Sequence, residues 1–394
     1  MIKTKQDTSK TERQLQNTQS RIAYFDGLRV LSMIGVIFMH VAAGPLRQGM
    51  GVTWHFLNVF VCFFFIAVPI FFMISGTVLL NSQNTYSVKY TLKNRMPKLV
   101  IPLLIWSVIA VLPAYLNPEA LQNGFNIIGY LKSLAVIPSQ NIVVHLWFMY
   151  FLIPLYLISP FLKILVDHMS DNAIRYLLLI WFLIMAMNTA VAFVPEHYRQ
   201  YSEIDFLSKL NFLDGYLGYF ILGFYLNRTK RIFSNKILIL VGTIDLLVII
   251  IGTFVRSKML GEFSQAFQST TMLYIAVLSI VIFLLFKQNY KVRKANWIIS
   301  YVASLSFGVY LMHNILISTF SHFNITSYFI NDTIPGVIGN SLLIVTVFIV
   351  CMIVITTLAT IKPLCYIFTG VKYDVACKTC NWIFLLRKLK LIKN

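Results

Sequence analysis

The sequence predicts an all-α, polytopic membrane protein with about ten membrane-spanning helices. Of its 394 residues, 58% are hydrophobic and only 12% are charged, and the mean hydropathy is +0.74. A soluble globular protein is about 45–50% apolar and about 25% charged, so this composition excludes that class. Apolar runs long enough to cross a bilayer recur along the whole chain.

Ten apolar segments are candidates for membrane spans, and two polar tails flank them. The predicted spans are residues 23–44, 54–80, 97–117, 144–166, 173–194, 211–227, 236–254, 271–287, 297–320 and 338–361. The sixth and eighth have only 17 residues each, a length that a helical bundle tolerates. We therefore expect one membrane domain over residues 23–361, between a cytosolic tail at 1–22 and a basic cytosolic tail at 362–394.

The distribution of Lys and Arg predicts an orientation with both termini in the cytoplasm, and we expect the membrane to be the plasma membrane. The N-terminal tail carries five of these cations and lacks the apolar core of a signal peptide. With this tail inside, cytosolic segments hold 26 of the 33 Lys and Arg residues, outer loops hold six, and Arg29 lies within the first span. This bias explains the net charge of +19 without a nucleic acid partner, and it could attract a polyanion such as coenzyme A.

The first span carries two ionisable residues, Arg29 and His40, in the apolar stretch DGLRVLSMIGVIFMH. They are eleven residues apart, which returns to nearly the same helix face and separates them by about 16 Å along the axis. Ionisable groups inside a bilayer are costly and usually face a protein interior or a wet cavity. The pair indicates a polar path through the membrane. Taken singly, Arg29 could merely snorkel to the interface, and His40 could be a satisfied buried histidine.

Further polar residues fall at matching depths in other spans. Ser75 ends the second span near the depth of Arg29, and His313 lies in the ninth span near the depth of His40. Tyr310 shares a helix face with His313, and His145 and Trp147 open the fourth span at the outer surface. Each also has a structural explanation. Ser75 with the following glycine could permit close helix packing, Trp147 could be an interface anchor, and Tyr310 could be a core residue.

Together these residues favour group transfer across the membrane. Histidine is the side chain best suited to proton transfer near neutral pH, and His40, His145 and His313 can gather toward the outer half. Arginine with serine and glycine lies toward the inner half. This division suggests a donor with anionic groups that enters from the cytosol and a hydroxyl acceptor that is activated farther out.

The five cysteines predict neither a disulfide framework nor a metal site. Cys377 and Cys380 form a single CxxC, and a zinc site would need a second pair nearby. We therefore expect unpaired cytosolic thiols and no metal. The terminal segment FLLRKLKLIKN is amphipathic and basic, and we expect it to lie on the inner leaflet.

Five motifs resemble those of the membrane-bound acyltransferase 3 family. They are the arginine-x10-histidine of the first span, FFMISG at 71–76, RMPKLVIP at 95–102, HLWFMY at 145–150 and SFGVYLMH at 306–313. The motif order and the ten-span layout also resemble that family over roughly residues 23–361. The chain departs from many relatives in having no acidic residue after Trp147 until Asp167. Many relatives also carry an appended hydrolase-like domain, and we expect none here.

The resemblance implies an O-acyltransferase that moves an acyl group, usually acetyl, from cytosolic acetyl-CoA to a hydroxyl of an envelope glycan or polysaccharide. It implies that Arg29 and His40 are essential, and we add His313 as the rival catalytic histidine. We expect Ser75, His145, Trp147, Tyr310 and Arg95 to bind substrate. No bound cofactor is expected, since acetyl-CoA is a substrate, and membrane lipids are the remaining expected partners.

Two other functions stay open on the sequence alone. A polysaccharide or lipid-linked sugar exporter would also place polar groups at mid-membrane and would use broken helices. A structural or sensory membrane subunit, for example the membrane half of a two-part enzyme, would need no chemistry of its own. Only an acyltransferase would move label from acetyl-CoA to an acceptor.

The charge bias makes a testable prediction about topology. A cysteine placed in the 118–143 loop should react with an impermeant maleimide in whole cells, because that loop is predicted to lie outside. A cysteine at Lys291 should react only after the membrane is opened. The opposite labelling pattern would reverse the orientation and every depth given above.

Overall fold

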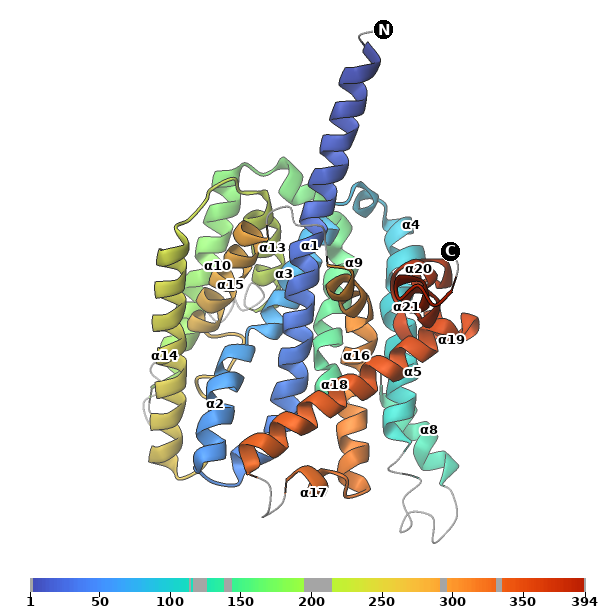
Figure 1. Ribbon diagram of the computed structural model, residues 1–394. Coiled ribbons are helices and arrows are strands. Elements are labelled where there is room, and N and C mark those ends of the chain that lie inside the picture. Colours follow the sequence, from blue (N-terminus) through green and yellow to red (C-terminus); the bar gives the residue numbers. More distant parts are fainter. Residues whose placement is uncertain are drawn as a thin grey trace. The chain divides into compact units, whose positions relative to one another are not determined.

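The computed structural model describes residues 3–112, 115, 126–137, 144–194, 215–290, 296–330 and 335–392, with the side chains of the first helix described from Ala23 onward. Regular secondary structure within these residues is entirely helical, which confirms the all-α prediction (Figure 1). The main helices are α1 (Lys3–Ala42), α2 (Val52–Phe64), α3 (Ala67–Leu80), α5 (Met96–Val111), α8 (Ile127–Val136), α9 (Trp147–His168), α10 (Asp171–Ala192), α13 (Tyr216–Arg228), α14 (Asn235–Leu260), α15 (Leu273–Asn289), α16 (Trp297–His322), α18 (Gly336–Thr360), α19 (Lys362–Thr369), α20 (Tyr373–Thr379) and α21 (Trp382–Lys388).

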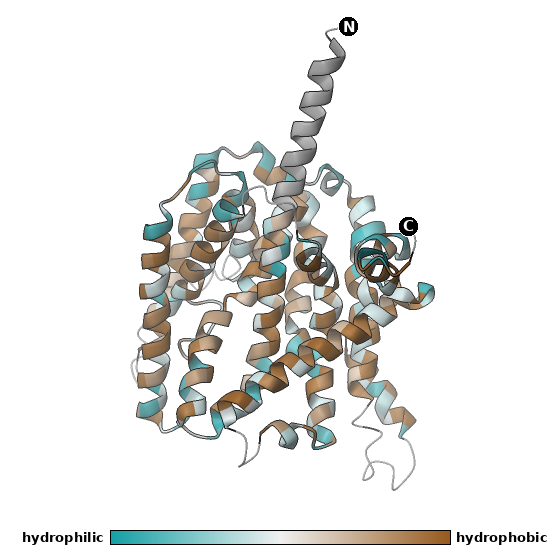
Figure 2. Cartoon of the chain, in the orientation of Figure 1, coloured by the Kyte–Doolittle hydropathy of each residue, from teal (hydrophilic) through white to brown (hydrophobic). Residues whose placement is uncertain are grey.

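Eight helical segments in the described part of the chain are long and apolar enough to cross a membrane. They are Ala23–Ala42, Val52–Leu80, Val88–Val111, Trp147–His168, Asp171–Ala192, Asn235–Leu260, Trp297–His322 and Gly336–Thr360. The two predicted short spans correspond to α13, with 13 residues, and α15, with 17. Figure 2 shows the expected pattern on α14, with apolar residues along its middle and polar residues at both ends.

The sequence predicted one continuous second span over residues 54–80. The structure instead breaks it between α2 and α3, at residues 65–66. Pro69 explains the break. A proline has no N–H group to bond the carbonyl four residues earlier, and its ring crowds that carbonyl, here that of Phe65. The chain turns through Phe65 and Ile66 and resumes as α3. Discontinuous spans are typical of membrane proteins that handle polar substrates at mid-membrane.

The chain folds as two compact units. Unit 1 comprises Met1–Val78 and Met169–Ser304, and unit 2 comprises Leu79–His168 and Leu305–Asn394. Unit 1 therefore holds α1, α2, most of α3, α10, α13, α14, α15 and the first turns of α16. Unit 2 holds α5, α8, α9, the rest of α16, α18 and the C-terminal helices α19, α20 and α21.

Two glycines bring α3 and α13 into backbone contact within unit 1. A Cβ atom added to Gly76 would lie 1.9 Å from the Phe220 carbonyl oxygen, and one added to Gly223 would lie 2.1 Å from the Met73 carbonyl oxygen. Small residues at such crossings let helix backbones approach closely in a membrane. The structure thus supports the packing explanation for the glycine of the FFMISG motif.

A buried polar network ties the loop before α15 to α2 and α14 in unit 1. The Gln268 amide nitrogen lies 3.3 Å from both the Asn58 side-chain oxygen and the Cys62 sulfur. The Cys62 thiol in turn lies 3.7 Å from the Thr253 hydroxyl. All four side chains are buried, and the network satisfies the Gln268 amide nitrogen but not its side-chain oxygen.

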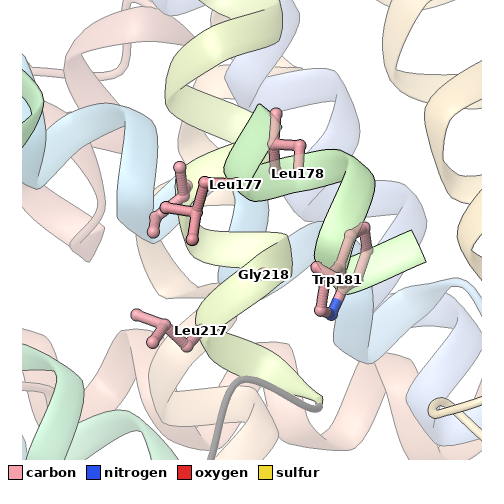
Figure 3. Close-up of a pocket in the computed structure, with 6 residues that line it drawn as sticks. Leu177, Leu178, Trp181, Leu217 and Gly218 are labelled. Carbon is pink, nitrogen blue, oxygen red and sulfur yellow. The ribbon is translucent and has the colours of Figure 1, made fainter. Parts of the chain in front are cut away.

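A small apolar hollow lies between α10 and α13 (Figure 3). Its lining residues are Leu177, Leu178, Trp181, Leu217, Gly218 and Ile221. The Trp181 indole donates to the Gly215 carbonyl at 3.2 Å and packs over Gly218, where a Cβ atom would lie 2.2 Å from the ring. The lining carries no titratable group, so we assign this hollow to packing and not to the functional site.

The α3–α13 crossing makes a prediction about stability. Gly76→Ala should lower the unfolding temperature of the detergent-solubilised protein, because the new methyl group meets backbone that cannot move aside cheaply; overpacking of this kind costs about 1–3 kcal/mol. Gly44→Ala is the matched control, since nothing lies within 4 Å of a Cβ atom there. Equal unfolding temperatures for the two variants would show that the crossing is not close-packed.

Candidate functional site

Arg29 is held by an acidic partner on its own helix. Its Nη1 lies 3.2 Å from Asp26 Oδ1, one turn earlier in α1, and the other carboxylate oxygen accepts from the Ser300 hydroxyl of α16 at 2.8 Å. The Asp26 side chain is only 9% exposed, whereas that of Arg29 is 32% exposed. Asp26 therefore anchors the guanidinium to the start of α16. A guanidinium has five N–H donors, and this contact uses one of them.

His40 lies on the same uninterrupted helix as Arg29. Because α1 has no break between them, the predicted shared face and the axial separation of about 16 Å hold. His40 is half-buried. The two residues thus mark two levels of a single rigid helix in unit 1.

Ser32 lies between these two levels and was not singled out from the sequence. Its hydroxyl is buried and has no hydrogen-bond partner among the described residues. Many other hydroxyls in the described helices bond the carbonyl four residues earlier, as Thr77 does to Met73 and Thr356 does to Met352. A hydroxyl three residues after Arg29 was the available signal, but serine is common in membrane helices for packing alone.

Ser75 belongs to unit 1 as well, on α3, and is half-buried. Its neighbour Gly76 is committed to the contact with α13. The SG pair of the motif therefore combines a close-packed glycine with a polar side chain on the same turn of helix.

Unit 2 gathers His145, Tyr310 and His313 into one buried cluster. Of the three histidines that the sequence placed toward the outer half, the structure brings these two together, and His40 belongs to unit 1. The His145 and His313 rings lie 5.0 Å apart between centroids in an edge-to-face arrangement. The Tyr310 hydroxyl donates to the backbone carbonyl of His145 at 2.5 Å. This bond joins the 3-10 turn Val144–Leu146, which directly precedes α9, to α16, so Tyr310 holds His145 in place and does more than fill the core.

Backbone carbonyls define the tautomers of both histidines. Nε2 of His145 lies 3.1 Å from the Leu311 carbonyl oxygen, and Nδ1 of His313 lies 2.6 Å from the Tyr310 carbonyl oxygen. A carbonyl can only accept, so these nitrogens carry the protons. The other ring nitrogens, Nδ1 of His145 and Nε2 of His313, are buried. The cluster thus brings two imidazole rings and one phenol together inside unit 2.

Trp147 and Phe148, neighbours in the HLWFMY motif, lie in different environments. Phe148 is buried, with its ring 5.5 Å from that of Tyr310. Trp147 is half-buried, and its ring packs 5.9 Å from that of Phe151, which is exposed on the surface of α9. This environment fits the interface-anchor explanation for Trp147 better than a place in the histidine cluster.

Arg95 makes local contacts that organise the segment before α5. It lies at the end of a π-helical turn, Thr91–Arg95, and donates to the Thr85 hydroxyl at 2.6 Å and to the Ser82 hydroxyl at 2.9 Å. Lys98, one turn further, lies within electrostatic range of Arg95 and of Lys372 from the C-terminal segment. Sequence analysis could not associate Lys372 with Lys98, because 274 residues separate them.

All five cysteines are free in the structure. Burial raises the pKa of the Cys380 thiol to about 11, and burial also raises that of Cys365, so both stay protonated at neutral pH. These two thiols are therefore poor nucleophiles. Among the described residues, no group of three or more His, Cys, Asp or Glu side chains is arranged to hold a metal ion.

A multi-helix membrane protein that places an arginine, histidines and a tyrosine inside its apolar helices belongs to the class of polytopic proteins that bind or transform polar substrates. Comparison with known families refines this class. A model described as an acyltransferase domain matches residues 22–360, nearly the whole chain, so the chain belongs to the acyltransferase 3 family and is a membrane acyltransferase. Comparisons with curated proteins and with solved structures find no match.

Proposed function

We propose that this acyltransferase is an O-acetyltransferase of the plasma membrane. It moves an acetyl or similar acyl group from cytosolic acyl-CoA to a hydroxyl of an envelope glycan or lipid-linked sugar. The observation that carries the proposal is the Arg29–His40 pair, which combines a charged donor-binding group and a proton-accepting group on one unbroken helix. Family membership supplies the reaction class, acyl transfer.

Arg29 binds the anionic or carbonyl part of the donor in this scheme. A guanidinium remains charged when it is partly buried and offers donors in a fixed fork that suits oxygen pairs. Asp26, which also accepts a hydrogen bond from Ser300, orients the guanidinium. Ser75, on the same unit, is a further contact for the donor.

Donor phosphates need cations on the cytosolic side. Arg95, Lys98 and Lys372 provide three positive charges there, with no acidic side chain among the hydrogen-bond partners of Arg95. Since coenzyme A is a polyanion, this cluster would attract its phosphate groups.

His40 is the general base for the acceptor. A sugar hydroxyl is a poor nucleophile at neutral pH, so His40 takes its proton while the hydroxyl oxygen attacks the thioester carbonyl. The C–S bond breaks, and the proton passes to the departing thiolate of coenzyme A. Alternatively, His40 itself accepts the acyl group and carries it outward as an acyl-imidazole. His313, with His145 and Tyr310, binds the acceptor or is the rival base.

Label transfer tests the proposed reaction. Purified protein incubated with radiolabelled acetyl-CoA and a membrane lipid extract should produce a labelled glycan or lipid-linked sugar. An exporter would move its substrate without taking up label. Transfer of a labelled succinyl group in place of acetyl would keep the reaction class and correct the donor.

The role of Arg29 can be tested in the same assay. Arg29→Lys keeps the charge but loses the fork, so activity should fall between about tenfold and about 10²-fold, the cost of one charge-assisted hydrogen bond. Arg228→Lys is the matched control, because Arg228 also pairs with an aspartate, Asp171, at 3.5 Å. A fully active Arg29→Lys enzyme would reject the bidentate role and leave only charge attraction.

A further inference from the structure

The C-terminal end of unit 2 is attached to the last membrane-spanning helix at a defined level. The Trp382 backbone N–H donates to the Thr360 hydroxyl at 3.1 Å, and its indole N–H donates to the Thr357 hydroxyl at 3.0 Å. Both threonines belong to the last turn of α18. Helix α21 therefore begins where the last span ends, beside α20 (Figure 1). A tryptophan at this level is typical of a membrane interface.

The end of α21 is a closed turn and not a fraying tail. The Leu391 N–H donates to the Leu386 carbonyl at 2.8 Å, and the Lys390 N–H donates to the Arg387 carbonyl at 3.1 Å. Lys390 has a φ of 59°, in the left-handed region that a lysine seldom adopts. This arrangement resembles the motif that ends helices with a glycine, so the segment holds a compact shape despite the strain.

Residues 387–392 form what we call the C-terminal basic patch. All six are exposed, and they alternate cations with apolar side chains in the order Arg, Lys, Leu, Lys, Leu, Ile. Leu389 is 57% exposed and Leu391 is 68% exposed. Segment 382–392 contains no acidic residue. Such a combination is costly in water but suits the boundary between headgroups and acyl chains.

We propose that the C-terminal basic patch binds the headgroups of anionic phospholipids in the leaflet at which α18 ends. The phosphate groups pair with Arg387, Lys388 and Lys390, and the apolar side chains enter the layer beneath them. The interaction anchors the segment that also supplies Lys372. It does not depend on the proposed acyl transfer, because it rests on charge and exposure alone.

The apolar side chains favour a lipid over a soluble polyanion. Coenzyme A could pair with the three cations, but it would leave Leu389, Leu391 and Ile392 in water. A membrane surface satisfies both kinds of side chain at once. Attachment of α21 to the end of α18 also holds the patch at the level where the last membrane-spanning helix ends.

Hydrogen exchange of the full-length protein in lipid nanodiscs tests this proposal. Backbone amides of residues 382–392 should exchange more slowly in discs that contain phosphatidylglycerol than in discs of phosphatidylcholine. Attraction to an anionic surface is about fivefold per cation near the surface, so three cations should slow exchange on the order of 10²-fold. High salt should reduce the difference, since it screens the charges.

Two variants and a control separate lipid binding from folding. The triple variant Arg387→Gln, Lys388→Gln, Lys390→Gln should lose the dependence on lipid charge. Lys390→Gly removes one cation and relieves the left-handed backbone, so it should keep the helix end and lose about fivefold of the effect. Lys230→Gln, Arg231→Gln, Lys236→Gln, which removes three exposed cations from another segment, should behave as the wild type.

Two results would overturn the proposal. Equal exchange in the two kinds of disc would show that lipid charge is not recognised. Slower exchange on adding coenzyme A to phosphatidylcholine discs, with no further effect of phosphatidylglycerol, would identify the ligand as a soluble polyanion.

Discussion

The pairing of Arg29 with Asp26 is the interaction on which the rest of the candidate site depends. An unpaired guanidinium inside an apolar helix would be expensive, and removing one member of a buried pair leaves the other uncompensated. The Asp26 carboxylate uses one oxygen for Arg29 and the other for Ser300, so it satisfies the charge and joins two helices at once. Asp26 is the more buried member of the pair, and Arg29 stays partly exposed.

Helix α1 is continuous, and this continuity relates Arg29 to His40. Some other helices of unit 1 are broken or short. The helix continues without a break from Arg29 to His40, so the distance between them is fixed by helix geometry. By contrast, the next span is interrupted before Pro69, and α13 has only 13 residues. Glycines compensate for the short helix by admitting backbone contacts with α3. The helix that carries the arginine and the histidine is thus continuous, whereas some of its neighbours are broken or short.

The sequence was sufficient where helix periodicity alone decides the geometry. It predicted the shared face of Arg29 and His40, and it placed His40, His145 and His313 toward the outer half, because depth along a span follows from residue count. It could not predict contacts between elements distant in the chain. The Tyr310 bond to the carbonyl of His145, the Ser300 bond to Asp26 and the approach of Lys372 to Lys98 depend on tertiary packing.

Other differences arise from residues whose effect is ambiguous in a sequence. Pro69 could have been tolerated in a continuous kinked helix, but here it ends one helix and starts another. Arg95 was expected to bind substrate, and its hydroxyl partners Ser82 and Thr85 show that it also organises local structure. Trp147 matched a motif, yet the buried aromatic residue beside Tyr310 is Phe148. In each case the type of side chain was evident from the sequence, but the residues that it contacts were not.

The most direct test compares two histidine variants in single-turnover acyl transfer, with donor binding measured separately. His40→Ala should lower transfer roughly 10²–10⁴-fold, the range for loss of a general base, while acetyl-CoA still binds. His313→Ala should weaken binding of the acceptor, with a smaller loss in the rate of transfer. Near-normal transfer by His40→Ala, together with its loss in His313→Ala, would contradict the account and place the catalytic histidine on α16.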